Sequence, residues 1–250
     1  MTGGVRVAVR DWCAWAPERA TRAAWRAWAG GAAPAPGDGE PPAALPMMLR
    51  RRTSPLGQKL IAAALACGDA AQTARYVLAS RHGELARTVG IIDALRQGEL
   101  PSPAEFSLSV HHGLAGLLSI HTGNRCGHTA LAAGPDSFAF GLMEAAACVA
   151  ERPEEPVLLL YGDAPMPDEY AAFRCEDDAV LPLAVALVLG PAGEGGETIA
   201  MTPAPAAPTP LSADAPAEPV ALAFLRFLLS GAPHARAAGT RMAWEWRRAA

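Results

Sequence analysis

The sequence from Ala74 to Ile120 reads ARYVLASRHGELARTVGIIDALRQGELPSPAEFSLSVHHGLAGLLSI and changes between strand and helix patterns. Residues 75–80 (RYVLAS) predict a strand. Residues 84–97 have apolar side chains at helical spacing and predict an amphipathic helix that ends at Gly98. Residues 106–120 carry no fixed charge and predict a buried helix. A strand followed by helices is typical of an α/β fold.

Strand and helix patterns also alternate on both sides of this stretch. Val5, Val7 and Val9 alternate with other residues and predict a short strand. Further elements are expected as helices from Pro17-Glu18 (with Trp25 and Trp28 on one face), from Ser54-Pro55 and over 136–150, and as strands over 129–133, 157–161 and 183–189. The Val/Leu runs of the last two strands are typical of strands covered on both faces. The pattern supports an α/β fold.

The C-terminal part of the sequence has a different composition. Residues 190–219 are rich in Pro, Ala and Gly and predict a linker, while 220–229 predict a helix and 241–247 a final strand. We therefore expect a main domain over 1–190 and a linker over 191–219. Residues 220–250 are expected to form a C-terminal helix and strand that pack on the same domain.

The composition excludes several classes of protein. The chain has 250 residues, of which 51% are hydrophobic and 18% charged, which suffices for a sizeable core. A net charge of −4 argues against a nucleic-acid partner. The longest apolar run, 179–193, contains two prolines and is too short to span a membrane. Five widely spaced cysteines without a CxxC pair, and no recognisable leader, favour a reduced chain in the cytoplasm.

The segment from Ser107 to Ala145 carries the strongest chemical signal. A short strand runs into a sharp turn that opens a small-residue helix, and a cysteine at such a turn would be an activated nucleophile. The segment resembles the nucleophile region of β-ketoacyl synthases, members of the thiolase-like superfamily, through Ser119-Ile120, Gly123 and Gly127. This resemblance lays Ala133-Gly134-Pro135 on the family's Thr-Ala-Cys turn. Pro135 has neither a nucleophilic side chain nor a backbone N–H for an oxyanion hole.

The residue after Pro135 does not provide a nucleophile either. Asp136 is neither a thiol nor a hydroxyl, and we expect its carboxylate to cap the following helix and to fill the anion position there. We therefore expect the chain to have no catalytic residues.

A longer motif narrows the resemblance. The chain resembles the shortened ketosynthase-like proteins of aryl polyene gene clusters through Ala79–Glu84, Arg87-Thr88, Gly98-Glu99 and Phe106–His111. Leu49–Gln58 and the Trp-containing N-terminal region (Trp12, Trp15, Trp25 and Trp28) resemble them as well. The sequence departs from that pattern at His112, where the family usually has Asn.

The resemblance implies a truncated thiolase-like layered fold: the N-terminal half of a ketosynthase with a short remnant of the second half. It implies a non-catalytic chain-length factor that pairs with a catalytic ketosynthase, shapes the acyl tunnel and meets the growing chain on an acyl carrier protein. No cofactor is implied. Catalytic ketosynthases use two histidines from their second half, and here only His234 follows residue 190.

The resemblance also suggests site residues, because in ketosynthases the segment before the "SI…G" helix crosses the dimer interface. Phe106 is the candidate gate of the tunnel, and the candidate wall and interface residues are His111, Leu114, Leu117 and Leu118. The alternative is that each of them is an ordinary core residue. Arg50, Arg51 and Arg52 are candidates for docking the carrier protein, against the alternative of a solvated arginine cluster.

Two other interpretations of these residues remain open. His111, His112, His121 and His128, with Cys126, resemble a metal cluster in composition, but adjacent histidines point in different directions and we expect no metal site. Residues 80–84 (SRHGE) contain Ser, His and Glu, yet no GxSxG nucleophile elbow is present. The alternative function is an independent acyltransferase or hydrolase on a thiolase-like half fold.

Overall fold

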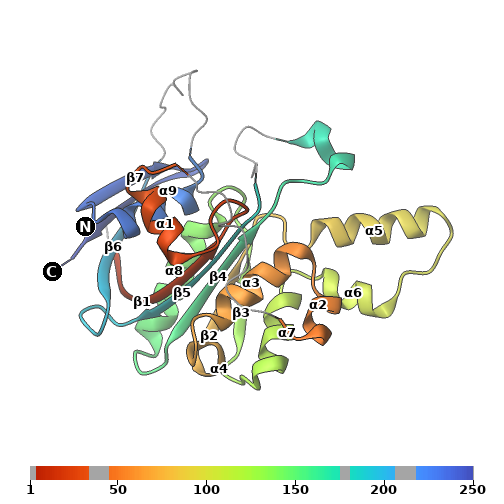
Figure 1. Cartoon of the computed structure of the whole chain (residues 1–250), viewed down its shortest axis with the longest axis horizontal. Coiled ribbons are helices and arrows are strands. Elements are labelled where there is room, and N and C mark those ends of the chain that lie inside the picture. Colours follow the sequence, from red (N-terminus) through yellow and green to blue (C-terminus); the bar gives the residue numbers. More distant parts are fainter. Residues whose placement is uncertain (1–3, 34–44, 175–180, 206–217, 250) are drawn as a thin grey trace.

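One mixed sheet organises the protein, as seen in a computed structural model that describes residues 4–33, 45–174, 181–205 and 218–249 (Figure 1). Its strands are β1 (Val5–Trp15), β2 (Arg75–Ala79), β3 (His128–Leu131), β4 (Val157–Asp163), β5 (Leu183–Gly190), β6 (Glu197–Pro205), β7 (His234–Ala238) and β8 (Met242–Arg248). Their order in the sheet is β3-β2-β4-β5-β1-β6-β8-β7. Strands β3, β2 and β4 are parallel, and the remaining neighbours are antiparallel.

Helices cover both faces of this sheet. They are α1 (Arg22–Ala29), α2 (Met47–Arg52), α3 (Pro55–Leu65), α4 (Ala70–Thr73), α5 (Leu85–Arg96), α6 (Pro103–Ser109), α7 (Gly113–Thr122), α8 (Ser137–Glu151) and α9 (Val220–Ser230), with a 3-10 helix η1 (Asp168–Phe173). Figure 1 shows α5 and α6 as an arm that extends from the body beside α2 and α7.

Two hydrophobic cores lie on opposite faces of the sheet. The first core packs the sheet against α1, α8 and α9, and the second core packs it against α3 and α7. The pleat of β4 divides its side chains between them: Leu159 and Tyr161 belong to the first core, and Leu158 and Leu160 to the second. Both faces are buried, which explains the unbroken Val/Leu runs of β4 and β5. The predicted α/β class is confirmed.

Strand β1 is longer than the strand predicted around Val5, Val7 and Val9, and a bulge explains the difference. The register against β5 shifts between Val9 and Asp11. The extra residue reverses the alternation, so Val9 and Trp12 both face the first core although they are three residues apart. A period of two therefore recognises the strand only up to the bulge.

The predictions for the first helices have mixed outcomes. The helix expected from Pro17-Glu18 begins only at Arg22, because Thr21 provides the cap: its hydroxyl accepts the Ala24 N–H at 3.1 Å. Trp25 and Trp28 do share a face, with their rings edge-to-face at 5.2 Å. The start at Ser54-Pro55 is confirmed, since Ser54 Oγ accepts the Gly57 N–H at 3.0 Å.

The single helix predicted over 106–120 is two helices, α6 and α7. The chain is extended at Val110 (ψ 147°), which ends α6. Gly113 then begins α7 against the end of α6, where an added Cβ would lie 3.3 Å from the Leu108 carbonyl oxygen. Two helices therefore meet at a close turn that only a small residue fits.

The C-terminal part joins the same sheet. Residues 197–205, inside the stretch expected to be a linker, form strand β6 and pair with both β1 and β8. The prediction of a linker over 191–219 is therefore wrong for this part, and residues 206–217 lie outside the described residues. Strand β8 matches the predicted final strand, whereas β7 was not predicted. Helix α9 packs on α8, with the Phe138 and Phe224 rings 5.1 Å apart.

Candidate functional site

Strand β3 leads through a turn at residues 132–136 into α8, and the sequence predicts an empty nucleophile position at this turn. Asp136 directly precedes α8 and is fully buried. Its Oδ1 accepts a hydrogen bond from the Trp244 indole N–H at 2.8 Å, and its Oδ2 accepts one from the Arg241 backbone N–H at 3.1 Å. These donors come from the β7–β8 hairpin and offset the cost of burying the carboxylate.

Asp136 thus acts differently from the expected cap. It occupies the cap position, but its side chain makes no hydrogen bond to α8, so that part of the prediction is wrong. The carboxylate instead ties the start of α8 to the hairpin 108 residues away. Gly239 in the hairpin lies so close that a Cβ there would overlap Asp136 Oδ1. The C-terminal hairpin therefore closes over the turn.

Pro135 lies half-buried in the same turn. Gly134 before it has a left-handed φ of +61°, and Ser137 Oγ accepts the Ala133 N–H at 2.9 Å. The Ser137 hydroxyl in turn donates to the Gly134 carbonyl at 2.6 Å. The one hydroxyl at the turn is therefore engaged in holding the backbone, and Pro135 itself offers no nucleophile.

None of the cysteines in the described part of the chain lies at this turn. Cys126 is exposed and its thiol donates to the Thr73 carbonyl, while Cys148 lies near the other end of α8. Burial raises the pKa of the Cys13 thiol to about 11 and that of Cys67 to about 12, so both are protonated at neutral pH. Cys175 lies outside the described residues.

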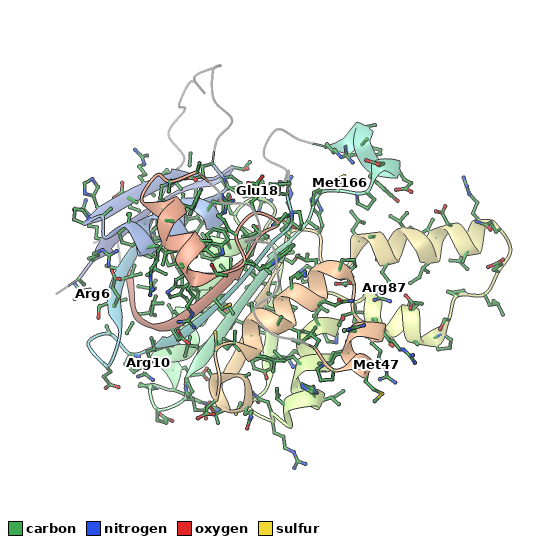
Figure 2. The ribbon with its side chains drawn as sticks, viewed as in Figure 1. Arg6, Arg10, Glu18, Met47, Arg87 and Met166 are labelled. Atoms are coloured by element: carbon green, nitrogen blue, oxygen red, sulfur yellow. The ribbon has the colours of Figure 1, made fainter. Side chains whose placement is uncertain are left out.

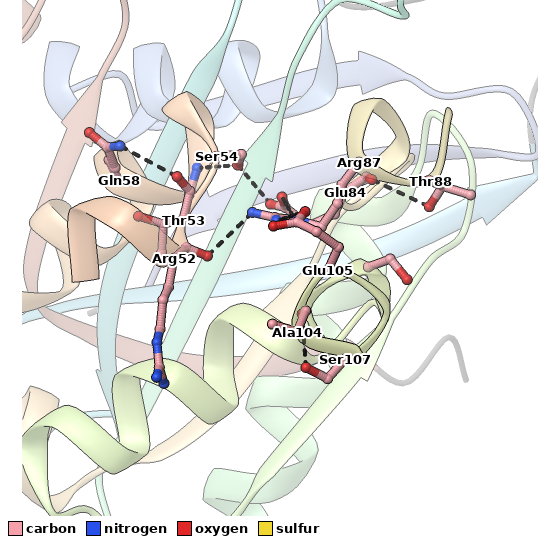
Figure 3. A network of polar contacts seen from close by, with 12 residues as sticks. Arg52, Thr53, Ser54, Gln58, Glu84, Arg87, Thr88, Ala104, Glu105 and Ser107 are labelled. Atoms are coloured by element: carbon pink, nitrogen blue, oxygen red, sulfur yellow. Dashed lines mark hydrogen bonds and ion pairs between the residues drawn. The ribbon is translucent and has the colours of Figure 1, made fainter. Parts of the chain in front are cut away.

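A polar network joins the sequence motifs that carry the family resemblance (Figure 3). The Ser54 hydroxyl donates to Glu84 Oε1 at 2.8 Å, and Arg87 pairs with Glu84 and with Glu105. Arg87 also donates to the Arg52 carbonyl at 3.3 Å. The Glu84 side chain is only 4% exposed and that of Arg87 13%. The start of α3, the start of α5, the end of α2 and α6 are thus held together by one ion-pair network.

His111 joins the loop after β2 to strand β3. Its Nε2–H donates to the Leu131 carbonyl at 3.0 Å. Its ring lies against Gly83, where a Cβ would come within 2.7 Å of His111 Nδ1 and where φ is +57°. Ser80 Oγ accepts the Gly83 N–H at 2.8 Å. The SRHGE loop is shaped by these contacts, which explains why it needs glycine at position 83.

The residues expected to line a tunnel are not gathered on one accessible wall of this chain. Phe106 on α6 is 63% exposed. Leu117 and Leu118 are buried in the second core, and Leu114 packs against Gly57 of α3. The role of these residues in a tunnel stays a prediction, and among them Phe106 presents the most surface to a partner.

Four large exposed apolar side chains lie on three helices: Met47 and Met48 on α2, Phe106 on α6 and Ile120 on α7. We call the exposed side of α2, α6 and α7 the α2–α7 face. Figure 2 shows Met47 on α2 below Arg87. Helix α7 also contacts β3, which is an edge strand of the sheet. Exposed apolar side chains and an open sheet edge are both typical of a protein interface.

The remaining candidates are dispersed. The rings of His112 and His128 stack at 5.7 Å, and burial lowers the pKa of His128. In the described residues no three potential ligands gather into a metal site. Arg50, Arg51 and Arg52 are exposed on α2.

The contacts of Ser80 and Glu84 in the described residues do not fit the Ser/His/Glu interpretation of residues 80–84. Ser80 Oγ serves the Gly83 N–H, and the Glu84 carboxylate is engaged by Ser54 and Arg87.

A second polar cluster lies where β4 ends, and the sequence analysis missed it. Asp163 is buried and accepts hydrogen bonds from the backbone N–H groups of His82 and Ala164. The Tyr161 hydroxyl donates to Asp163 Oδ2 at 3.5 Å. Burial raises the pKa of Asp163 from 3.8 to about 6. The only signal in the sequence is an Asp at the end of the apolar stretch that forms β4.

Comparison with known proteins gives a family and a fold. Residues 25–247 match the model of the β-ketoacyl synthase N-terminal domain. A chain from the ketosynthase (ApeO) in complex with its chain length factor (ApeC) from Xenorhabdus doucetiae is 30% identical, with a TM-score of 0.84 over 98% of this chain and 100% of that chain. No curated protein sequence matches at a significant level.

More distant structures share the fold alone. The ishigamide ketosynthase/chain length factor is 15% identical, with a TM-score of 0.60 over 81% of this chain and 68% of that chain. A β-ketoacyl synthase from Burkholderia phymatum is 13% identical, with a TM-score of 0.56 over 92% of this chain and 71% of that chain. In the part of the chain that the structure describes, no helix has the length and apolarity to cross a membrane.

Proposed function

The chain belongs to the family of the β-ketoacyl synthase N-terminal domain, and on this premise we propose that it is the non-catalytic chain-length-factor subunit of a ketosynthase heterodimer. The resemblance and the thiolase-like fold expected from the sequence are thereby confirmed. The catalytic partner elongates a chain carried on an acyl carrier protein. This subunit closes the partner's acyl tunnel and so limits the product length. The expected setting is polyene or polyketide assembly in the cytoplasm.

One observation carries this proposal: the turn that would present a nucleophile is closed. Pro135 provides no nucleophile, and the buried Asp136 carboxylate is bound by Trp244 and Arg241 of the C-terminal hairpin. A buried carboxylate also repels a second negative charge, which a thiolate or an oxyanion would bring. Condensation therefore has to take place on a partner.

The α2–α7 face is the surface proposed for the ketosynthase. It combines Met47, Met48, Phe106 and Ile120 with the open edge of β3. A partner strand or helix there would bury the apolar side chains and pair the outer side of the edge strand. We further propose Phe106 as the gate, because it is exposed on that face and lies in the segment that crosses the interface in ketosynthases. Arg50, Arg51 and Arg52 on α2 are the proposed docking residues for the acidic carrier protein.

Co-expression with the ketosynthase encoded in the same gene cluster tests the subunit assignment. We expect a stable 1:1 complex that elongates acyl chains on the carrier protein, and no condensation by this chain alone. The variant Ile120→Asp should weaken the complex, whereas Phe173→Asp, on an exposed position of η1, should not. Condensation by the isolated chain would contradict the proposal. So would a chain that stays monomeric in the presence of the ketosynthase.

The gate is tested separately in the assembled complex. Phe106→Ala should lengthen the products, because the smaller side chain leaves the tunnel end open. Phe173→Ala is the matched control, since it removes an equally exposed phenyl ring outside the α2–α7 face. An unchanged product distribution in Phe106→Ala would remove Phe106 from the gate, while leaving the subunit assignment intact.

A further inference from the structure

A cavity of about 280 Å³ lies beside the carboxyl ends of strands β2 and β4. The end of β1, the first turns of α3 and α5, and the segment after β4 enclose it. Most of its lining is apolar, with Trp15, Leu56, Leu85, Met166 and four prolines. An apolar cavity at the carboxyl ends of parallel strands is a common place for a small-molecule site in α/β proteins.

The charged side chains at this cavity differ in whether a group of opposite charge pairs with them. Glu84 is held by Ser54 and Arg87, and His82 lies beside Asp163. Lys59 is different: its ammonium lies 4.8 Å from the centre of the Trp15 ring, and no carboxylate of the described residues pairs with it. The cavity therefore combines an apolar wall with one cation whose charge is not balanced by a neighbouring acid among these residues.

This combination defines the ligand. An apolar wall without several hydrogen-bonding groups disfavours sugars and nucleotides. A single ammonium matches one negative charge, and the nearby Glu84 carboxylate disfavours a polyanion. We propose that the cavity binds a small amphiphilic monoanion, of the class of medium-chain carboxylates. Its carboxylate lies at Lys59, and its apolar body lies against Trp15, Leu56 and Met166.

None of the exposed apolar side chains of the α2–α7 face lines the proposed site. Figure 2 shows Met166 beyond the end of β4 and Met47 on α2, well apart in the view. At about 280 Å³ the cavity is at the small end of ligand pockets, which are about 300–1,000 Å³, and it cannot hold a long chain. The inference therefore concerns a second ligand and does not depend on the chain-length-factor role.

The chain offers a direct test, because Lys59 is its only lysine. Sodium octanoate, octan-1-ol and octylamine are titrated into the full chain by calorimetry, and Lys59 acetylation by an amine-reactive ester is followed by mass spectrometry. Octanoate should bind about tenfold more tightly than octanol, as expected for one charge-assisted hydrogen bond at a half-buried site, and octylamine should not compete. Octanoate should slow acetylation of Lys59 and leave the α-amino group unaffected.

Two variants and one control complete the test. Lys59→Met keeps an apolar stem without the charge and should lower octanoate binding to the octanol level. Ala86→Phe, at an exposed position of α5 that lines the cavity, should weaken both ligands without disturbing a core. Arg96→Met removes one exposed positive charge at the far end of α5 and should change nothing. Equal binding of octanoate and octanol, unchanged affinity in Lys59→Met, or no protection of Lys59 would each overturn the proposal.

Discussion

The contact between Asp136 and Trp244 makes a quantitative prediction about stability. Both side chains are fully buried, and the indole N–H donates to the carboxylate at 2.8 Å. Asp136→Ala removes the acceptor and leaves two donors, the Trp244 indole and the Arg241 backbone N–H, without their partner. Each donor that loses its partner away from water costs about 1–3 kcal/mol, so we expect the unfolding free energy to fall by about 2–6 kcal/mol.

A double-mutant cycle isolates the contact itself. Trp244→Phe removes the indole N–H and keeps an aromatic ring against Phe140, whose ring centre is 5.1 Å away. The cycle of Asp136→Ala, Trp244→Phe and the double variant is measured by urea unfolding of the full chain. We expect a coupling of about 1–3 kcal/mol, because a hydrogen bond to a buried charged group is worth about that much.

Trp246→Phe is the matched control for this cycle. Trp246 is equally buried and stacks on Phe227, but its indole N–H has no hydrogen-bond partner in the described residues. Its coupling with Asp136→Ala should lie within about 0.5 kcal/mol of zero. If Trp244 couples no more strongly than Trp246, the carboxylate does not hold the hairpin, and the explanation of the closed turn fails.

Two further predictions concern buried acids. Because burial raises the pKa of Asp163 to about 6, the folded chain keeps this proton up to a higher pH than the unfolded chain, whose aspartates titrate near pH 4. The unfolding free energy should therefore decrease as the pH rises from about 4 to 6, by about 3 kcal/mol in total, and Asp163→Asn should abolish that decrease in urea midpoints measured across this window. Glu84→Gln should lower the unfolding free energy by about 2 kcal/mol, because the buried Glu84 carboxylate binds Ser54 and Arg87, whereas Asp93→Asn, which breaks an exposed pair with Arg96, should change it by under about 0.5 kcal/mol. If Glu84→Gln and Asp93→Asn lowered the unfolding free energy equally, the network of Ser54, Glu84 and Arg87 would not stabilise the fold as proposed.

The local patterns of the sequence predict the elements that one segment can specify by itself. The Val/Leu runs of β4 and β5 and the start of α3 at Ser54-Pro55 depend on nearest neighbours and are confirmed. Strand β6 was not predicted because it lies in a Pro/Ala-rich segment, which is typical of a linker. This segment becomes a strand by pairing with β1 and β8. Pairing partners far along the chain cannot be inferred from local periodicity.

The candidate site shows the same division. Pro135 could be singled out by its position in a motif, and the motif residues Glu84, Arg87 and Ser54 do meet in one network. The partners of Asp136 could not be predicted, because Trp244 is 108 residues away and an isolated Trp gives no sign of its hydrogen bond. The Lys59 cavity could not be predicted either, since its wall comes from five separate segments of the sequence.

The position of β1 in the sheet has a consequence for biosynthesis. This strand is synthesised before the other strands of the sheet, yet both of its neighbours, β5 and β6, come from residues 183–205. Pairings this distant in sequence form slowly, and the unpaired apolar strand is exposed to aggregation until they do. Its docking must therefore wait until most of the chain has been synthesised, so chaperone binding to the nascent N-terminal strand and low yields of C-terminally shortened chains are expected.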